Sequence, residues 1–206
     1  MTTIRYRPEI DGLRSIAVLS VILYHAEFNY SGNQLFKGGF FGVDIFFVIS
    51  GFLITSLINK ELYATQKFSF KNFYDKRIRR LLPVLISVII LSLPFAYVLL
   101  LPEALIDFSK SIIATTVFLS NFYWHESLQV YGAELSNLKP LLHTWSLAIE
   151  EQYYLLFPIV IVVGFKWFKS YLFFILFLIS VVSLILSEIM SRNDPSYSFY
   201  FLSTRV

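Results

Sequence analysis

Cysteine is absent from the 206 residues, and charged side chains make up only 15% of them. The absence of cysteine excludes disulfides, thiolate metal sites and a cysteine nucleophile, so any chemistry must use other side chains or a cofactor. Soluble domains contain about 25% charged residues, whereas this chain is 56% hydrophobic and has a mean hydropathy of +0.65. The composition therefore indicates a protein that lies in a lipid bilayer.

Six apolar segments follow one another along the chain. They cover residues 13–28, 40–58, 81–101, 111–124, 146–165 and 170–190. Helices and closed β-barrels are the two structures that satisfy backbone hydrogen bonds in lipid, and the alternating strands of a barrel do not occur in this sequence. We therefore expect an all-α, polytopic transmembrane helix bundle over residues 1–206, without a soluble domain.

Positive charge suggests an orientation for this bundle. Residues 59–80 hold seven Lys or Arg side chains against two acidic ones, which predicts a cytoplasmic loop. The N-terminus, with Arg5 and Arg7, then also lies in the cytoplasm, and residues 13–28 form a retained helix rather than a signal peptide. Simple alternation would put Lys166 and Lys169 outside, unless the short segment 111–124 does not cross the membrane. The sequence leaves these two topologies open.

The first segment contains ionisable residues, which are costly in lipid and usually functional. Arg14 and His25 are eleven positions apart, so on a helix they share one face about 16 Å apart. Asp11 joins the same stripe near the cytoplasmic end. A structural alternative is that Arg14 reaches lipid phosphates and that His25 is an interfacial residue.

The second segment opens with three glycines and then places Asp44 among apolar side chains. Glycines permit close helix approach or a helix break. A carboxylate in such surroundings needs a partner, for which His25 or an arginine is the natural candidate. Alternatively, Asp44 caps a helix or makes an ordinary hydrogen bond within the bundle.

Two further motifs lie at expected helix starts. Arg77, Arg79 and Arg80 precede the third segment, where they either set topology or bind phosphate groups through guanidinium forks. Glu150 and Glu151 stand near the start of the fifth segment, and we expect one to face the bundle and one to face water. The alternative is a first helical turn enriched in acid, which favours the helix dipole.

Taken in order, four stretches resemble the acyltransferase-3 family of the O-antigen acetylase type. Residues 7–25 are similar to its opening R-x10-H motif, 39–54 to its second-helix signature, and 73–83 to its arginine-rich loop. Residues 143–158 resemble its S-L-A-x-E-E-Q-F-Y motif, with Ile149 and Tyr153 as mild departures. Domains of this family have about ten helices, so we expect further helices to follow, with residues 200–205 beginning the next one.

The resemblance implies an acetyl-CoA-dependent O-acetyltransferase of the bacterial cytoplasmic (inner) membrane. It would move acetyl from cytoplasmic acetyl-CoA to a hydroxyl of a surface polysaccharide or lipid-linked sugar such as O-antigen, without metal or nucleic acid. His25 would act as general base or acyl relay, because imidazole titrates near neutrality. Arg14 would orient the donor or stabilise charge on its carbonyl oxygen.

The remaining candidates support these two residues. Asp11 or Asp44 would orient the histidine, and Glu150 is the expected inward carboxylate. The phosphates of acetyl-CoA would bind to Arg77, Arg79 and Arg80. A transporter or flippase that uses Arg14, His25 and Asp44 as a proton or substrate path is the alternative function, and a non-catalytic assembly factor is a third.

Overall fold

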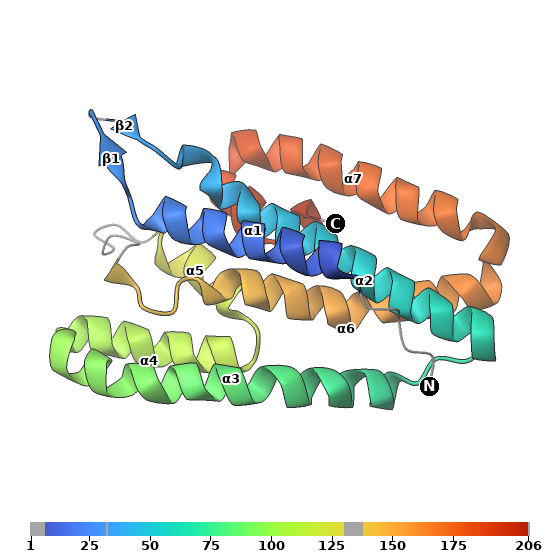
Figure 1. The fold of residues 1–206 in the computed structure, drawn as a ribbon, viewed down its shortest axis with the longest axis horizontal. Helices are drawn as coiled ribbons and strands as arrows, with labels where there is room; N and C mark the ends of the chain where they lie inside the picture. Colours follow the sequence, from blue (N-terminus) through green and yellow to red (C-terminus); the bar gives the residue numbers. More distant parts are fainter. Residues whose placement is uncertain (1–6, 32, 130–137, 206) are drawn as a thin grey trace. The chain divides into compact units, whose positions relative to one another are not determined.

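The computed structural model describes residues 7–31, 33–129 and 138–205, so Arg5 lies outside the described residues. The chain divides into two compact units, Met1–Phe68 and Ser69–Val206. Both units are built from helices, which confirms the expected all-α bundle (Figure 1). The helices are α1 (Pro8–His25), α2 (Phe41–Thr65), α3 (Phe70–Leu99), α4 (Pro102–Thr116), α5 (Ser120–Ser127), α6 (Thr144–Trp167), α7 (Leu172–Asn193) and α8 (Pro195–Tyr200). Within the described residues, 3-10 turns precede α2 at Lys37–Phe40, join α6 to α7 at Lys169–Tyr171, and follow α8 at Leu202–Thr204.

Four helical segments of the described chain are long and apolar enough to cross a membrane. They are Lys37–Thr65, Phe70–Leu99, Thr144–Trp167 and Lys169–Asn193. The first predicted segment is helical as α1 but is not among these four, because its 18 residues include Glu9, Asp11 and Arg14. The structure therefore supports a multi-pass membrane protein with a more polar first helix.

In the first unit, α1 and α2 pack side by side (Figure 1). A short antiparallel hairpin, β1 (Asn29–Tyr30) and β2 (Asn33–Gln34), lies between them in the chain. Gly39 and Gly42 are both buried against α1, where an added Cβ would overlap the carbonyl oxygens of Ser20 and Ala17. The glycines thus allow the close approach that the sequence suggested.

The basic stretch 59–80 is helical over most of its length, which corrects the expected loop. Helix α2 continues to Thr65 and ends at Gln66, whose φ of 55° is left-handed. Helix α3 begins at Phe70, and the Ser69 hydroxyl accepts a hydrogen bond from the Asn72 amide at 3.4 Å as its N-cap. Lys and Arg form helices readily and extend their charged ends toward water, so charge does not require a loop here.

The segment 111–124 is also corrected, because it is not one helix. Helix α4 ends at Thr116, α5 begins at Ser120, and Phe118 between them has a φ of 56°. The break is held by the Gln152 side chain on α6, which donates to the Phe118 carbonyl oxygen at 2.9 Å. The Ser120 hydroxyl, which is buried, donates to the carbonyl of Thr144 at 2.9 Å. Side-chain hydrogen bonds therefore replace helical ones at this turn.

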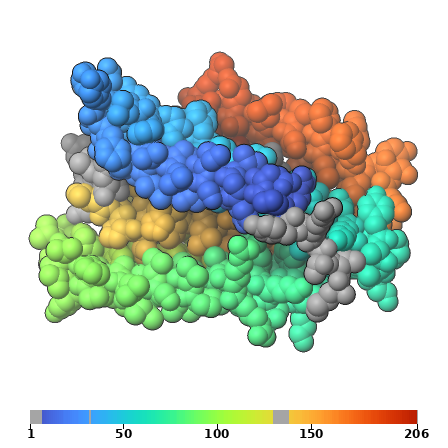
Figure 2. Space-filling model, viewed as in Figure 1, coloured from blue at the N-terminus to red at the C-terminus, as the bar shows by residue number. Residues whose placement is uncertain are grey.

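In the second unit, α4 turns back along the C-terminal half of α3, and their side chains form one continuous surface (Figure 2). The junction of α6 and α7, which carries Lys166 and Lys169, lies at the same end of this unit as the start of α3 (Figure 1). The core gathers around α5 and α6, where Trp124, Ile149 and Tyr154 are almost fully buried. Most side chains of α3 and α7 are exposed in the bundle, as lipid-facing helices require.

Candidate functional site

Arg77 on α3 faces both acidic residues of α6. Its Nη2 atom lies 3.2 Å from Glu151 Oε1 and 3.9 Å from Glu150 Oε1. The exposed fractions of the three side chains are 24% for Arg77, 15% for Glu151 and 24% for Glu150, so the group is largely shielded. We expected Glu150 to face the bundle and its neighbour to face water, whereas both face Arg77 and Glu151 is the less exposed and the closer of the two. Neighbouring helical positions diverge by about 100°, but a guanidinium placed between them reaches both.

Tyrosines complete this cluster. The Arg77 guanidinium lies over the ring of Tyr154, with Cζ 3.3 Å from the ring centre, and the Tyr154 hydroxyl donates to Glu150 Oε1. The Tyr74 hydroxyl of α3 donates to the carbonyl of Leu155 at 3.0 Å. Sequence reasoning missed both tyrosines. The four-residue spacing of Glu150 and Tyr154 was the available signal, since such residues are neighbours on a helix surface.

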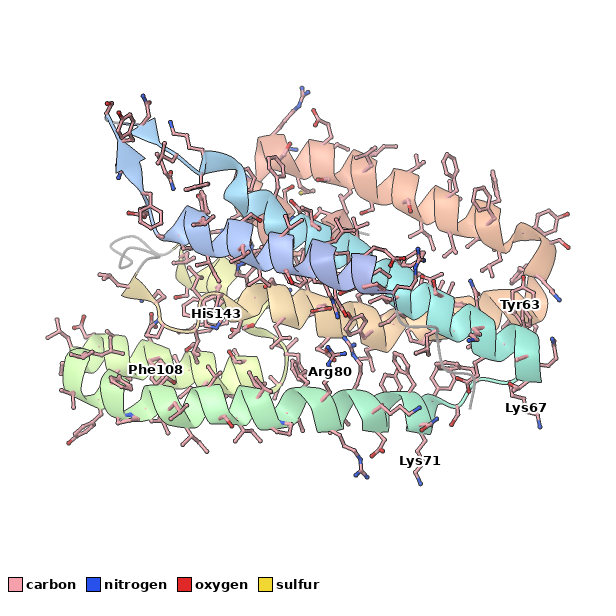
Figure 3. The ribbon with its side chains drawn as sticks, viewed as in Figure 1. Tyr63, Lys67, Lys71, Arg80, Phe108 and His143 are labelled. Carbon is pink, nitrogen blue, oxygen red and sulfur yellow. The ribbon has the colours of Figure 1, made fainter. Side chains whose placement is uncertain are left out.

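The other two arginines of α3 have different surroundings. Arg79 Nε lies 2.9 Å from Asp75 Oδ2 one turn earlier, and both side chains are exposed. Arg80 is exposed, and within the described chain it makes no hydrogen bond or ion pair. In Figure 3, Arg80 lies on the side of α3 that faces α6, whereas Lys71 points away. Of the three, Arg80 is therefore the side chain whose guanidinium is available to an anionic ligand.

In the first unit, Arg14 is half-buried on α1, and its Nε atom is buried without a hydrogen-bond partner in the described chain. A buried donor that lacks an acceptor costs about 1–3 kcal/mol. An oxygen atom of a ligand that reached this guanidinium would remove the cost. The geometry therefore favours a role of Arg14 in binding negative or polarised oxygen.

His25 is the last residue of α1 and is exposed. Its Nδ1 atom lies 2.9 Å from the carbonyl oxygen of Val21. A carbonyl oxygen can only accept, so Nδ1 carries the proton in the neutral ring and Nε2 holds the lone pair. The edge of the Tyr24 ring, with centroids 5.1 Å apart, also fixes the imidazole. His25 therefore presents an unprotonated nitrogen outward, as a general base requires.

The two aspartates of this unit lie at other points. Asp11 is exposed near the start of α1, fourteen positions before His25, which corresponds to about 21 Å along the helix. Asp11 therefore does not orient the imidazole by contact. Asp44 is half-buried in the first turn of α2, where a carboxylate favours the helix dipole. The orientation of His25 comes from the main chain of α1.

A further charged group lies in the second unit, outside the candidate spans. Lys139 Nζ lies 2.6 Å from Asp107 Oδ2, and the Tyr123 hydroxyl donates to Asp107 Oδ1 at 2.9 Å. Partial burial opposes ionisation of Asp107, but the hydrogen bonds from Lys139 and Tyr123 outweigh it and hold its pKa below the usual range. Burial, followed by the bond to Asp107, raises the pKa of Tyr123 to about 12. No set of three metal-ligating side chains occurs within the described residues.

Comparison with known proteins places the chain in a family. The Acyltransferase domain family matches residues 7–203. The chain belongs to this acyltransferase family. O-acetyltransferase OatA of Staphylococcus aureus strain NCTC 8325 is 40% identical to it over 205 residues, covering 98% of this chain and 33% of that protein. The OatA protein of strain MRSA252 shows the same identity and coverage.

The chain thus spans about a third of the length of the curated relatives it matches. No solved structure matches it significantly. As a member of the acyltransferase family, it carries two separate groups of candidate residues. The first unit holds a histidine whose Nδ1 is bonded to the main chain, and an arginine whose Nε has no acceptor among the described residues. The second holds a shielded Arg77 and an available Arg80.

Proposed function

We propose that the chain is part of a membrane O-acetyltransferase that takes acetyl from cytoplasmic acetyl-CoA and passes it to a hydroxyl of a cell-surface polysaccharide or lipid-linked sugar. The observation that carries this proposal is the state of His25 in a member of the acyltransferase family. An alcohol must lose its proton as it attacks a thioester, and an imidazole with an outward lone pair accepts that proton. The relatives at 40% identity are O-acetyltransferases by name, which supports acetyl as the group transferred.

Two arginines are each proposed to bind a group of the donor. Arg80 supplies a guanidinium for a phosphate of the donor, since its fork matches phosphoryl oxygens. Arg14 lies about 16 Å from His25 along α1, so it would bind an oxygen of the donor away from the reacting carbonyl and orient the donor there. Arg77 has a different part, because two carboxylates already neutralise it and it therefore fixes α3 to α6.

The proposed orientation puts the start of α3 in the cytoplasm. The basic residues before and within its first turns favour that side by the positive-inside rule. Lys166 and Lys169 at the α6–α7 junction lie at the same end of the unit, so the same rule supports the same assignment. The break between α4 and α5 supports the topology in which residues 111–124 do not cross the membrane.

The test uses the full-length protein with His25→Ala and His25→Gln. Removal of a general base lowers turnover by about a hundredfold to ten-thousandfold, so both variants should transfer almost no acetyl from labelled acetyl-CoA. Ser15→Ala is the matched control, because Ser15 is exposed on the same helix and its hydroxyl bonds only to the Asp11 carbonyl. Mass analysis of surface polysaccharide should show the same loss in cells. Normal acetylation by a stably expressed His25→Ala protein would refute the assignment, and transport without acetylated product would support the flippase alternative.

A further inference from the structure

A serine, a histidine and an aspartate meet in the second unit, and none of the three belongs to the candidate residues described above. His125 on α5 has its Nδ1 atom 2.9 Å from the Ser196 hydroxyl of α8. Its Nε2 atom lies 3.9 Å from Asp194 Oδ2, at the N-cap of α8. A hydroxyl on one ring nitrogen and a carboxylate on the other is the arrangement that activates serine as a nucleophile.

A neighbouring amide determines which ring nitrogen carries the proton. The Gln129 Nε2 atom lies 3.2 Å from His125 Nδ1, and an amide nitrogen can only donate. Nδ1 must therefore be the unprotonated nitrogen in the neutral ring, which places the N–H on Nε2 toward Asp194. In this tautomer the Ser196 hydroxyl and the Gln129 amide both donate to the one lone pair of Nδ1, and the hydroxyl is the closer donor, at 2.9 Å against 3.2 Å. The hydroxyl proton therefore points at the base that would remove it.

The surrounding contacts keep the three side chains in place and leave them accessible. The second carboxylate oxygen of Asp194, Oδ1, accepts the main-chain N–H of Tyr197 at 2.9 Å. The His125 ring meets the ring of Phe201 edge to face, with centroids 5.0 Å apart. The exposed fraction is 20% for the His125 side chain and 39% for Asp194, so a small acyl group can reach this cluster.

The cluster also lies at a particular end of the unit. Helix α5 and the C-terminal end of α7 lie away from the α6–α7 junction, which carries the lysines (Figure 1). If the basic end is cytoplasmic, the cluster lies toward the opposite membrane surface, from which the proposed acceptor, a surface glycan, would be reached.

We propose that Ser196 is an acyl-accepting nucleophile, with His125 as its base and Asp194 as the carboxylate that stabilises the protonated ring. This inference rests on the proposed acetyl transfer and adds a covalent acyl-serine intermediate to it. The Ser196 oxygen forms a bond to the carbonyl carbon of an acetyl thioester or ester, and its proton passes to Nδ1. The bond from that carbon to the sulfur or oxygen of the donor breaks, and the leaving group takes the proton. Attack by a sugar hydroxyl on the Ser196 ester then returns the serine and its proton.

The experiment treats the purified full-length protein with p-nitrophenyl acetate, an activated ester that needs no coenzyme A site. We expect an acetyl adduct on the peptide that contains Ser196, absent from Ser196→Ala. The His125→Gln variant should form it about a hundredfold more slowly. Ser191→Ala is the control, because Ser191 is exposed on α7 and bonds only to the Glu188 carbonyl. An unchanged adduct in Ser196→Ala would overturn the proposal.

A second variant keeps the proposal testable if Ser196→Ala fails to fold. Because these 206 residues contain no cysteine, Ser196→Cys introduces one thiol into this part of the protein, and its alkylation by iodoacetamide, followed on the peptide that contains residue 196, reports activation by His125. It should react faster than the thiol of Ser191→Cys, and His125→Gln should abolish the difference. Equal rates would overturn the proposal. Acetyl transfer from acetyl-CoA without any Ser196 adduct would reject this site and leave the proposed function supported. A Ser196 adduct without transfer from acetyl-CoA would support this site and reject the proposed function.

Discussion

Three arginines within four positions of α3 show how different one residue type becomes in different surroundings. Arg77 lies between two carboxylates and a tyrosine ring, Arg79 pairs on the surface, and Arg80 is exposed without a partner in the described chain. In the sequence, the three arginines form one basic motif. The structure separates a residue that holds two helices together from one that can bind a ligand.

This difference in surroundings predicts that two similar substitutions affect different properties, one stability and the other donor binding. Arg77→Ala should lower the thermal unfolding temperature in detergent, because it leaves Glu150 and Glu151 shielded without their cation, at a cost of about 1–3 kcal/mol. Arg80→Ala should leave that temperature unchanged and weaken acetyl-CoA binding, as measured by calorimetry. If Arg80→Ala instead lowers stability with unaltered donor affinity, the assignment of a phosphate contact is wrong.

The Asp107 carboxylate predicts that the stability of the protein depends on pH in the acidic range. Its pKa is held below the ordinary value of about 4 by Lys139 and Tyr123, which act against the effect of burial. A depressed pKa contributes stability above the ordinary value, and this contribution is lost as the pH falls through the folded-state pKa. Wild-type protein should therefore lose stability below about pH 4 more steeply than Asp107→Asn.

Thermal unfolding between neutral and acid pH measures the difference. Glu103→Gln is the control, because Glu103 is exposed in the first turn of the same helix. Parallel pH profiles for wild type and Asp107→Asn would show that the ion pair with Lys139 contributes nothing to folding.

Among the elements, the pairing of α1 with α2 depends on glycine. A Cβ on Gly39 would overlap the Ser20 carbonyl and lie 2.7 Å from Tyr24 Cβ, whereas one on Gly38 would meet only a Phe41 ring carbon at 4.0 Å. Gly39→Ala should therefore separate the two helices, lower thermal stability and reduce acetyl transfer. Gly38→Ala, one residue away, should behave as wild type. Equal stability of the two variants would show that α1 and α2 are not closely packed at this point.

Hydropathy predicts the long helices well, because a span needs little besides apolar length. The all-α fold and the close glycine contact followed from such local signals. The break at Phe118 did not, since it depends on Gln152, which lies 34 positions later in the chain. The cluster of Arg77 with Glu151 likewise joins residues 74 positions apart, and a single sequence does not show which carboxylate an arginine will meet.

The candidate site was predictable to a similar degree. His25 and Arg14 are marked by their cost in an apolar helix, and the unbroken α1 supports their shared face. The proton position on His25 was not predictable, because it follows from the Val21 carbonyl and not from an aspartate. The grouping of His125 with Ser196 gave no signal, since its members lie on separate helices.

At the scale of the whole molecule, the orientation of the second unit can be measured with single cysteines in this cysteine-free chain. Lys71→Cys and Lys169→Cys should resist a membrane-impermeant maleimide added to intact cells, because both belong to the basic end. Glu126→Cys on α5, which is also exposed, should react. All three should react after the membrane is permeabilised. Labelling of Lys71→Cys and Glu126→Cys from the same side would contradict the proposed topology.

The length of α3 also matters for the membrane around it. Its 30 residues correspond to about 45 Å, whereas the hydrocarbon layer is about 30 Å thick. The basic residues lie in the first turns of α3, so we expect the surplus at this end and the guanidiniums of Arg77 and Arg80 near the depth of the lipid phosphates. A thicker bilayer would draw these turns inward, and a thinner one would lift them into water. The thickness of the bilayer would therefore change how strongly anionic lipids compete with the donor for these guanidiniums.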